Sequence, residues 1–216
     1  MNIEDMPLRE RKHIKTKIEL AKTFAEMLKT TRINDISIKK VCKKVEVSEA
    51  TFYNYFPATK NVMSYIVRLF MFKTIWLNEK DFNNKSILKN INSIFQCMAA
   101  ENGNSHIIHE VEAFFISERI SRDVKKLTNA ELMVAFPECE GIEQVNIGGI
   151  KEYLRKLIKM AIKYKELPSK TNVENTLIAL ATILVGTSIA LDYHRVSEMG
   201  KYFEIQLNLL WKGLNV

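Results

Sequence analysis

The chain has 216 residues, of which 47% are apolar and 26% charged, and its formal net charge is +7. This is a globular composition with enough apolar side chains for a core, which excludes a low-complexity chain. The charge is uneven, since residues 1–63 hold 13 Lys/Arg against 8 Asp/Glu. A basic N-terminal third suits a polyanion such as nucleic acid, although a merely soluble basic surface fits it equally well.

Three widely spaced cysteines, Cys42, Cys97 and Cys139, form neither a CxxC pair nor a Cys/His zinc pattern. They predict a reducing compartment, and residues 1–30 show no apolar signal-peptide core, so we expect a cytoplasmic protein. Residues 175–191 form an uncharged run of 17 residues. A spanning helix needs about 20, so this run predicts a core or interface helix, with membrane association as the alternative.

Helical spacing runs through the whole chain, and with only 7 Gly and 4 Pro little interrupts it. The first predicted helix covers residues 12–30. It carries one apolar stripe, formed by Ile14, Ile18, Ala21, Ala25 and Leu28. Ser37 and Ser48 then stand where they can cap two short helices, the second ending before Pro57.

Thr59 is the predicted cap of a helix over residues 60–80. Further helices are expected at residues 86–101, 106–121, 143–166, 171–193 and 197–214, whereas residues 122–141 are ambiguous. Thr171-x-x-Glu174 has the spacing of a capping box. The predicted fold is therefore all-α, with about nine helices and no flexible linker.

Two short helices joined by three or four residues define a helix-turn-helix, here at residues 37–56. The first helix braces the second, which enters the major groove of DNA. Six side chains are expected to pack the pair together, namely Ile38, Val41, Cys42, Val45, Val47 and Phe52. Hydroxyl, amide and aromatic side chains of the second helix are then left for phosphates and base edges.

The letters of this motif resemble the DNA-binding signature of the tetracycline-repressor (TetR) family. The match is Val47-Ser48-x-x-Thr51-Phe52-Tyr53-x-Tyr55-Phe56, after a first helix in the place that the family requires. It covers about 60 residues, and Leu209–Leu214 looks like the end of that family's last helix. The resemblance implies a DNA-binding domain at 8–60 and a larger helical domain for dimerisation and effector binding at 61–216.

The predicted DNA-binding residues are Ser37, Lys39, Ser48, Glu49, Ala50, Thr51, Tyr53, Asn54, Tyr55 and Lys60. At three positions in or next to the motif, the sequence departs from the family pattern. Glu46 stands where the family usually has a glycine with positive φ, so strain is expected there. The family's phosphate-binding lysine falls at Thr59, one position before Lys60. Glu49 would face a polyanion, where it would accept from a cytosine amine or lean towards a lysine.

The C-terminal helices predict a homodimer. The predicted interface residues are Ala179, Ile183, Gly186, Ala190, Tyr202 and Leu209, and the alternative is the core of a monomer. A ligand pocket is predicted from Phe70, Trp76, Phe95, Met98, Phe114, Phe115, Met160 and Tyr164. These side chains fit an ordinary apolar core as well.

His106 and His109, near Glu110 and Glu112, lack a third fixed ligand, so no metal is predicted, and no cofactor. No nucleophile, phosphate-loop or dinucleotide motif is present, so we do not expect an enzyme. The leading hypothesis is a repressor that binds a palindromic operator as a dimer and is released by a small molecule. The alternatives are a DNA-binding regulator controlled by a protein partner, an all-helical enzyme and a membrane-associated protein.

Overall fold

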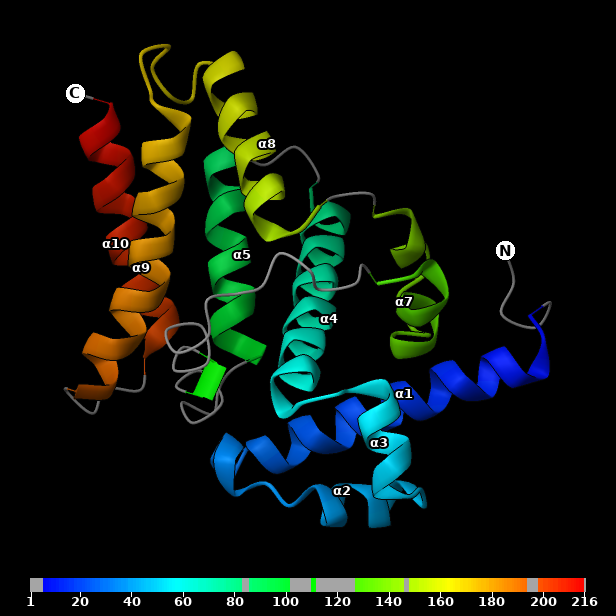
Figure 1. Cartoon of the computed structure of the whole chain (residues 1–216). Coiled ribbons are helices and arrows are strands. Elements are labelled where there is room, and N and C mark those ends of the chain that lie inside the picture. Colours follow the sequence, from blue (N-terminus) through cyan, green and yellow to red (C-terminus); the bar gives the residue numbers. More distant parts are fainter. Residues whose placement is uncertain are drawn as a thin grey trace. The chain divides into compact units, whose positions relative to one another are not determined.

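A computed structural model describes residues 6–82, 86–101, 110–111, 127–145, 148–193 and 198–215. In these ranges it contains nine α-helices, two short 3-10 helices and no strand (Figure 1). The predicted all-α fold class is therefore confirmed. The chain divides into two compact units, of which unit 1 comprises residues 1–73 and 106–146, and unit 2 comprises residues 74–105 and 147–216.

Unit 1 holds the N-terminal helices together with a later segment of the chain. Its elements are α1 (Leu8–Leu28), η2 (Ile33–Asp35), α2 (Ile38–Val45), α3 (Glu49–Tyr55), the start of α4 (Thr59–Lys80), α7 (Asn129–Ala135) and η3 (Ile142–Gln144). Helix α1 packs against α2, α3 and α7. Unit 1 is thus discontinuous in sequence, whereas the prediction of a functional boundary at residue 60 stays a prediction.

The predicted apolar stripe of α1 faces the core of unit 1. Ile14, Ile18, Ala21 and Leu28 are buried, and Ala25 is half-buried. Leu20 and Phe24 are buried as well, which widens the stripe. Because α1 has partners on several sides, it buries more of its surface than a single stripe.

Unit 2 is a bundle of α5 (Ile87–Glu101), α8 (Ile150–Lys163), α9 (Val173–Tyr193) and α10 (Met199–Leu214), with the end of α4 (Figure 1). Helix α10 packs on α5 and α9, and α8 also packs on these two helices. The rings of Phe95 and Phe203 meet edge-on, with centroids 5.3 Å apart. The predicted helix over 106–121 lies largely outside the described residues.

Helix α8 is shorter than predicted at both ends. It begins at Ile150, directly after Gly149, whose φ is 129°. It ends at Lys163, and two residues later Lys165 has a positive φ of 61°. Glu166, predicted to be helical, instead accepts hydrogen bonds from the Ile87 and Leu88 amides at 2.8 and 3.0 Å. It thereby caps the start of α5, where a carboxylate is favoured by the helix dipole.

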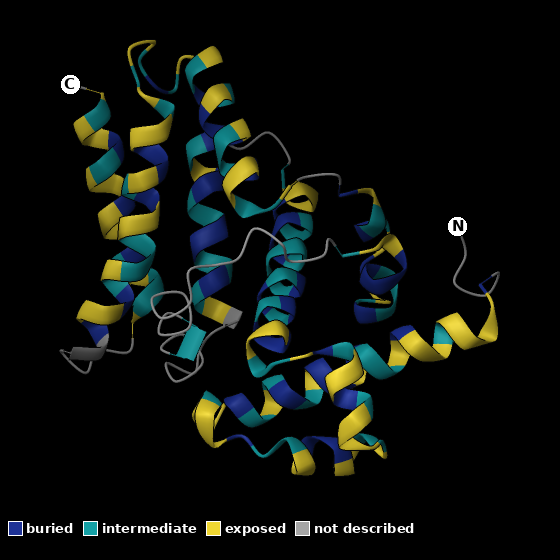
Figure 2. Ribbon diagram, viewed as in Figure 1, coloured by how far each residue is buried: buried dark blue, intermediate teal, exposed yellow. Residues whose placement is uncertain are grey.

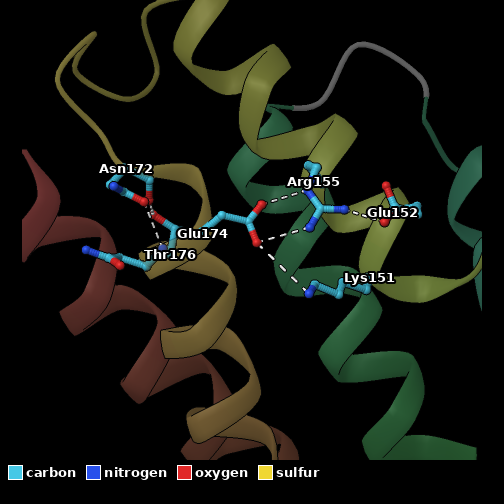
Figure 3. Close-up of polar contacts among 7 residues, drawn as sticks. Lys151, Glu152, Arg155, Asn172, Glu174 and Thr176 are labelled. Atoms are coloured by element: carbon cyan, nitrogen blue, oxygen red, sulfur yellow. Dashed lines mark hydrogen bonds and ion pairs between the residues drawn. The ribbon is translucent and has the colours of Figure 1, made fainter. Parts of the chain in front are cut away.

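The predicted capping box at the start of α9 is wrong. The helix begins at Val173, and the Asn172 side-chain oxygen accepts from the Asn175 amide at 3.0 Å. Glu174 instead binds Arg155 of α8 with both carboxylate oxygens, at 2.8 and 3.1 Å (Figure 3). Arg155 also donates to Glu152, so one guanidinium joins α8 to the first turn of α9.

Candidate nucleic-acid interface

Two serine caps set the start of each helix in the α2–turn–α3 segment. The Ser37 hydroxyl accepts from the Lys40 amide at 3.3 Å, and the Ser48 hydroxyl accepts from the Thr51 amide at 3.1 Å. Each cap satisfies an amide that the first turn of a helix leaves without a partner. Only three residues separate α2 from α3, as the motif predicted.

The turn requires a left-handed residue, and Glu46 provides it. Its φ and ψ are 58° and 41°, and its amide donates to the Cys42 carbonyl. The positive φ predicted for this position is confirmed. A side chain other than glycine in this conformation costs about 1–2 kcal/mol, so the geometry of the turn is maintained against local strain.

The second helix is anchored by a buried side and presents a polar side to solvent. Phe52 is 0% exposed, and its ring packs against the ring of Phe56, with the ring centroids 5.6 Å apart. We name the opposite surface the α3 face; it consists of Glu49, Ala50, Tyr53 and Asn54, all exposed. These positions follow the spacing i, i+1, i+4 and i+5, so they share one side of the helix. Tyr53 keeps 47% of its surface exposed.

Two of the predicted contact residues lie beside this face. Thr51 is half-buried, and its hydroxyl lies 2.8 Å from the hydroxyl of Ser48. The ring of Tyr55 lies 4.5 Å from the His13 ring of α1. Burial raises the pKa of Tyr55, and a hydrogen bond with Thr16 opposes that rise. Tyr55 therefore ties the end of α3 to α1.

Exposed lysines surround the motif. Lys39, Lys40, Lys43 and Lys44 lie on the side of α2 opposite the buried Val41 and Cys42. Lys60 is exposed in the first turn of α4. Thr59 was predicted to cap α4, but it is the first residue of that helix. Just before it, the Ala58 amide donates to the Asn61 side-chain oxygen at 2.9 Å.

The side chain of Cys42 in α2 is buried, and its surroundings keep the thiol protonated. Burial raises its pKa, and the negative charge of Glu49 raises it further. A protonated thiol is a poor nucleophile and a poor metal ligand. Cys42 thus serves as an apolar core residue, which agrees with the packing role predicted for it.

Sequence reasoning missed α7 and the residue that holds it. Thr128 and Glu131 form a capping box, with the Glu131 amide donating to the Thr128 hydroxyl at 3.1 Å. The Thr128 amide in turn donates to the Glu131 carboxylate at 2.8 Å. The signal was present as Thr-x-x-Glu before an apolar run, but the surrounding residues had no clear helical period.

The predicted pocket residues differ widely in exposure. Phe95 and Met98 are buried, Phe70, Trp76 and Met160 are half-buried, and Tyr164 is 63% exposed. Phe114 and Phe115 lie outside the described residues. Met160 lines a cavity of about 390 Å³ on α8, together with charged residues such as Lys159 and Lys163. The predicted pocket stays a prediction.

Buried polar groups of α4, α5 and α8 lie inside unit 2. Tyr153 donates to the Asn78 side-chain oxygen, and the Asn78 amide donates to the Asn90 carbonyl, each at 2.9 Å. Burial raises the pKa of Tyr153, as does the charge of Glu79. The side-chain amide of Asn90 and the hydroxyl of Thr74 are buried and have no partner among the described residues. We call Thr74, Asn78, Asn90 and Tyr153 the polar core cluster.

Exposed residues run along α9 and α10 (Figure 2), and large apolar side chains are among them. The α9–α10 face consists of Ile178, Thr182, Gly186, Ile189, Ala190, Tyr202, Ile205 and Leu209. Of the predicted interface residues, Gly186, Ala190 and Leu209 are exposed, whereas Ala179, Ile183 and Tyr202 are half-buried. Ile183, Gly186, Ala190 and Tyr202 line a cavity of about 630 Å³ between the two helices.

Two general searches covered the described residues. One helical stretch, Val173–Leu191, is long and apolar enough to cross a membrane, and 28% of it is buried in the structure. No group of three or more His, Cys, Asp or Glu that could hold a metal ion occurs in the described ranges. His106 and His109, for which no metal was predicted, lie outside these ranges.

Two solved structures have a fold similar to that of this chain. One is a protein from Shewanella sp. PV-4 assigned to the tetR family of transcription regulators, with a TM-score of 0.56 and 12% identity. Another is the reduced form of E. coli NemR, with the same TM-score and identity. Each match covers 93% of this chain and 98% of the other chain.

No family model matches the chain, and no curated protein sequence matches it. The fold assignment therefore depends on the similarity of three-dimensional structure. The chain has the fold of the TetR-family transcription regulators, so the resemblance in the motif is confirmed at the level of the fold.

Proposed function

We propose that this protein is a DNA-binding transcription regulator whose α3 face enters the major groove. The α3 face carries this proposal, because it exposes an amide, a phenol and a carboxylate on a helix whose other side is buried. Such groups bind base edges and phosphates. The lysines of α2 supply positive charge beside it. A cytoplasmic location accords with this function.

A titration of fluorescent duplex DNA with the full chain tests the proposal. Tyr53→Ala should weaken binding to every sequence and lower the slope of affinity against salt, because Tyr53 is proposed to contact phosphate. Tyr164→Ala removes an exposed tyrosine from unit 2, 63% exposed against 47% for Tyr53, and serves as the control. Equal affinity and salt slope for both variants and the parent chain would remove α3 from the DNA-binding site.

The proposed assembly is a homodimer formed through the α9–α10 face. Ile178 and Leu209 are 65% and 59% exposed, which is unusual for large apolar side chains on a monomer. A methyl group added at Gly186 would meet no atom within 4 Å, so its own chain does not require a glycine there. A second helix approaching closely does give a reason for small residues on this surface.

The proposed mode of action is repression that ends when a small molecule binds the polar core cluster. An unpaired buried amide or hydroxyl costs about 1–3 kcal/mol, and an uncharged ligand with hydrogen-bonding groups would satisfy Asn90 and Thr74. Release of DNA requires that this ligand bind the released state more tightly than the DNA-bound state.

Asn90→Leu tests the ligand site. It removes the unpaired amide at similar volume, so the apparent melting temperature should stay the same or rise. A thermal-shift screen with uncharged amides and alcohols should give a hit with the parent chain that is lost in the variant. If the hits are the same for both, the cluster is not the ligand site. If neither chain gives a hit, control by a protein partner becomes the favoured alternative.

A further inference from the structure

A buried carboxylate joins three helices of unit 1. Glu131 of α7 is 6% exposed. Its carboxylate accepts from the ammonium group of Lys17 on α1 at 2.5 Å and from the hydroxyl of Tyr65 on α4 at 3.1 Å. The Lys17 ammonium also lies 4.3 Å from the centroid of the Tyr65 ring. We call Lys17, Tyr65 and Glu131 the α7 clamp.

The charges of the clamp depend on one another. Burial raises the pKa of Glu131, but hydrogen bonds from Lys17, Thr128 and Tyr65 outweigh burial and lower it overall. Burial lowers the pKa of the half-buried Arg68, and the charge of Glu131 opposes that fall. Glu131 is therefore ionised in the folded protein. Removing one partner of such a buried pair leaves the other charge uncompensated, which is strongly destabilising.

The C-terminal end of α7 is held by the same helix α1. Lys22 donates to the Ala135 carbonyl at 2.7 Å, one of the carbonyls that the last turn leaves without an internal partner. Helix α1 thus binds both ends of α7 through two lysines about one and a half turns apart. The following residue, Phe136, has the Lys73 ammonium 5.7 Å from its ring centroid.

We propose that α7 is part of the DNA-binding unit and that Glu131 is a positioning residue for it. Helix α1 braces α3 through the His13–Tyr55 contact and binds α7 on the residues that follow. While the clamp is closed, α1 has one defined position behind α3. When it opens, a smaller fraction of molecules has the geometry that binds DNA, and the apparent affinity falls by that fraction. This inference depends on the proposed function.

The position of the clamp in the chain makes it a point of control. Residues 106–146 of unit 1 are inserted between two segments of unit 2. The segment that carries α7 is therefore joined covalently, at both ends, to parts of the chain that build the bundle. A change in unit 2 that displaces this segment acts on Glu131 directly. As a switch, the clamp requires two discrete states: the closed one seen in the structure, and an open one in which the Lys17–Glu131 pair is broken.

The experiment compares Lys17→Met, Glu131→Gln and the double variant in the full chain. Lys17→Met should lower the affinity for duplex DNA about tenfold, because it removes the lysine that forms an ion pair with the buried Glu131 carboxylate. The double variant should bind better than Lys17→Met alone, since it removes the charge of Glu131 as well. The control is Glu26→Gln, which breaks the exposed Lys29–Glu26 pair of the same helix and should change nothing.

Hydrogen exchange provides a readout that does not involve DNA. In Lys17→Met, amides of α7 and of residues 14–28 should exchange about tenfold faster, whereas those of α5 and α10 should be unchanged. If Lys17→Met matches Glu26→Gln in DNA affinity and in exchange, the clamp has no positioning role. The clamp also has no positioning role if the loss of DNA-binding free energy in the double variant equals the sum of the losses in the two single variants. If the parent chain binds no duplex at all, the proposed function fails first, and this inference with it.

Discussion

The α3 face and the α9–α10 face are both exposed, yet opposite kinds of side chain build them. The α3 face shows a carboxylate, an amide and a phenol above a rigid apolar base at Phe52. The α9–α10 face shows isoleucine and leucine around glycine and alanine. Polar groups remain hydrated until a polar partner replaces the water, whereas large apolar groups are stable only when covered.

This contrast suggests two partners with different lifetimes. A surface of hydrogen-bonding side chains fits a partner that binds and leaves, with affinity set by salt and sequence. A surface of large apolar side chains fits a permanent partner, for which a second copy is the simplest source. The two faces belong to different units, so a change on one face should leave the other intact.

The largest expected effect comes from placing a charge in the apolar face. Leu209→Glu should raise the dissociation constant of the dimer by at least about a hundredfold, because a glutamate would be buried without a partner. Analytical ultracentrifugation over a range of concentrations measures this. Asn208→Glu, on the neighbouring side of α10, is the control and should remain dimeric. A Leu209→Glu chain that sediments like the parent would show that this face is not the interface.

The next effect concerns the polar face. Asn54→Ala should weaken binding to the preferred duplex about tenfold or more, and should reduce the preference over a scrambled duplex, since a base contact is worth about 1–3 kcal/mol. Asn208→Ala makes the same change in side chain on α10. Fluorescence anisotropy with both duplexes measures the ratio. An unchanged ratio for Asn54→Ala would mean that this side chain does not read the sequence.

A pH titration tests the support behind the polar face. Because the pKa of Glu131 is lower in the folded chain than its ordinary value of 4.5, its contribution is complete above that value. The contribution is lost as the pH falls below 4.5 through the folded pKa. Glu131→Gln should therefore be about 1–3 kcal/mol less stable at pH 7, because it leaves a buried hydrogen-bonding partner less well satisfied, and this gap should close as the pH falls below 4.5. Denaturant melts at each pH measure the gap, and a constant gap would contradict this account.

The smallest expected effect is in the turn itself. Glu46→Gly should stabilise the chain by about 1 kcal/mol, since glycine adopts a positive φ without strain. A calorimetric scan should show a rise of about 2–4 °C. Lys43→Gly, inside α2, should lower stability by a similar amount because glycine is a poor helix former. A fall in stability for Glu46→Gly would mean that the Glu46 side chain makes a favourable contact.

Local chemistry made the helix-turn-helix predictable. The caps at Ser37 and Ser48 and the stop at Pro57 act within a few residues, so the sequence alone reveals them. The positive φ of Glu46 was expected only from the resemblance to the TetR family, which usually has glycine at this position. The apolar stripe of α1 was predicted correctly from spacing, because a helix that covers a core repeats every three or four residues.

Contacts between distant residues were beyond such reasoning. Glu131 lies 114 residues from Lys17, and nothing in either local sequence marks them as a pair. Tyr55 has the spacing of a DNA contact, but its ring contacts the ring of His13. The sequence could not reveal this contact, since only the fold brings α1 next to α3. Glu174 fits a capping box, yet Arg155 is a stronger partner for its carboxylate.

The central claim is that two copies of the α3 face read one duplex, and in-vitro selection of DNA from a random pool tests it most directly. The account predicts an enriched inverted repeat whose half-sites lie about 34–36 Å apart, one helical turn or a multiple of it. Asn54→Ala should relax the preference at the same position in both half-sites. A pool that shows no enrichment after repeated rounds, or a single site without symmetry that Asn54→Ala leaves unchanged, would contradict it.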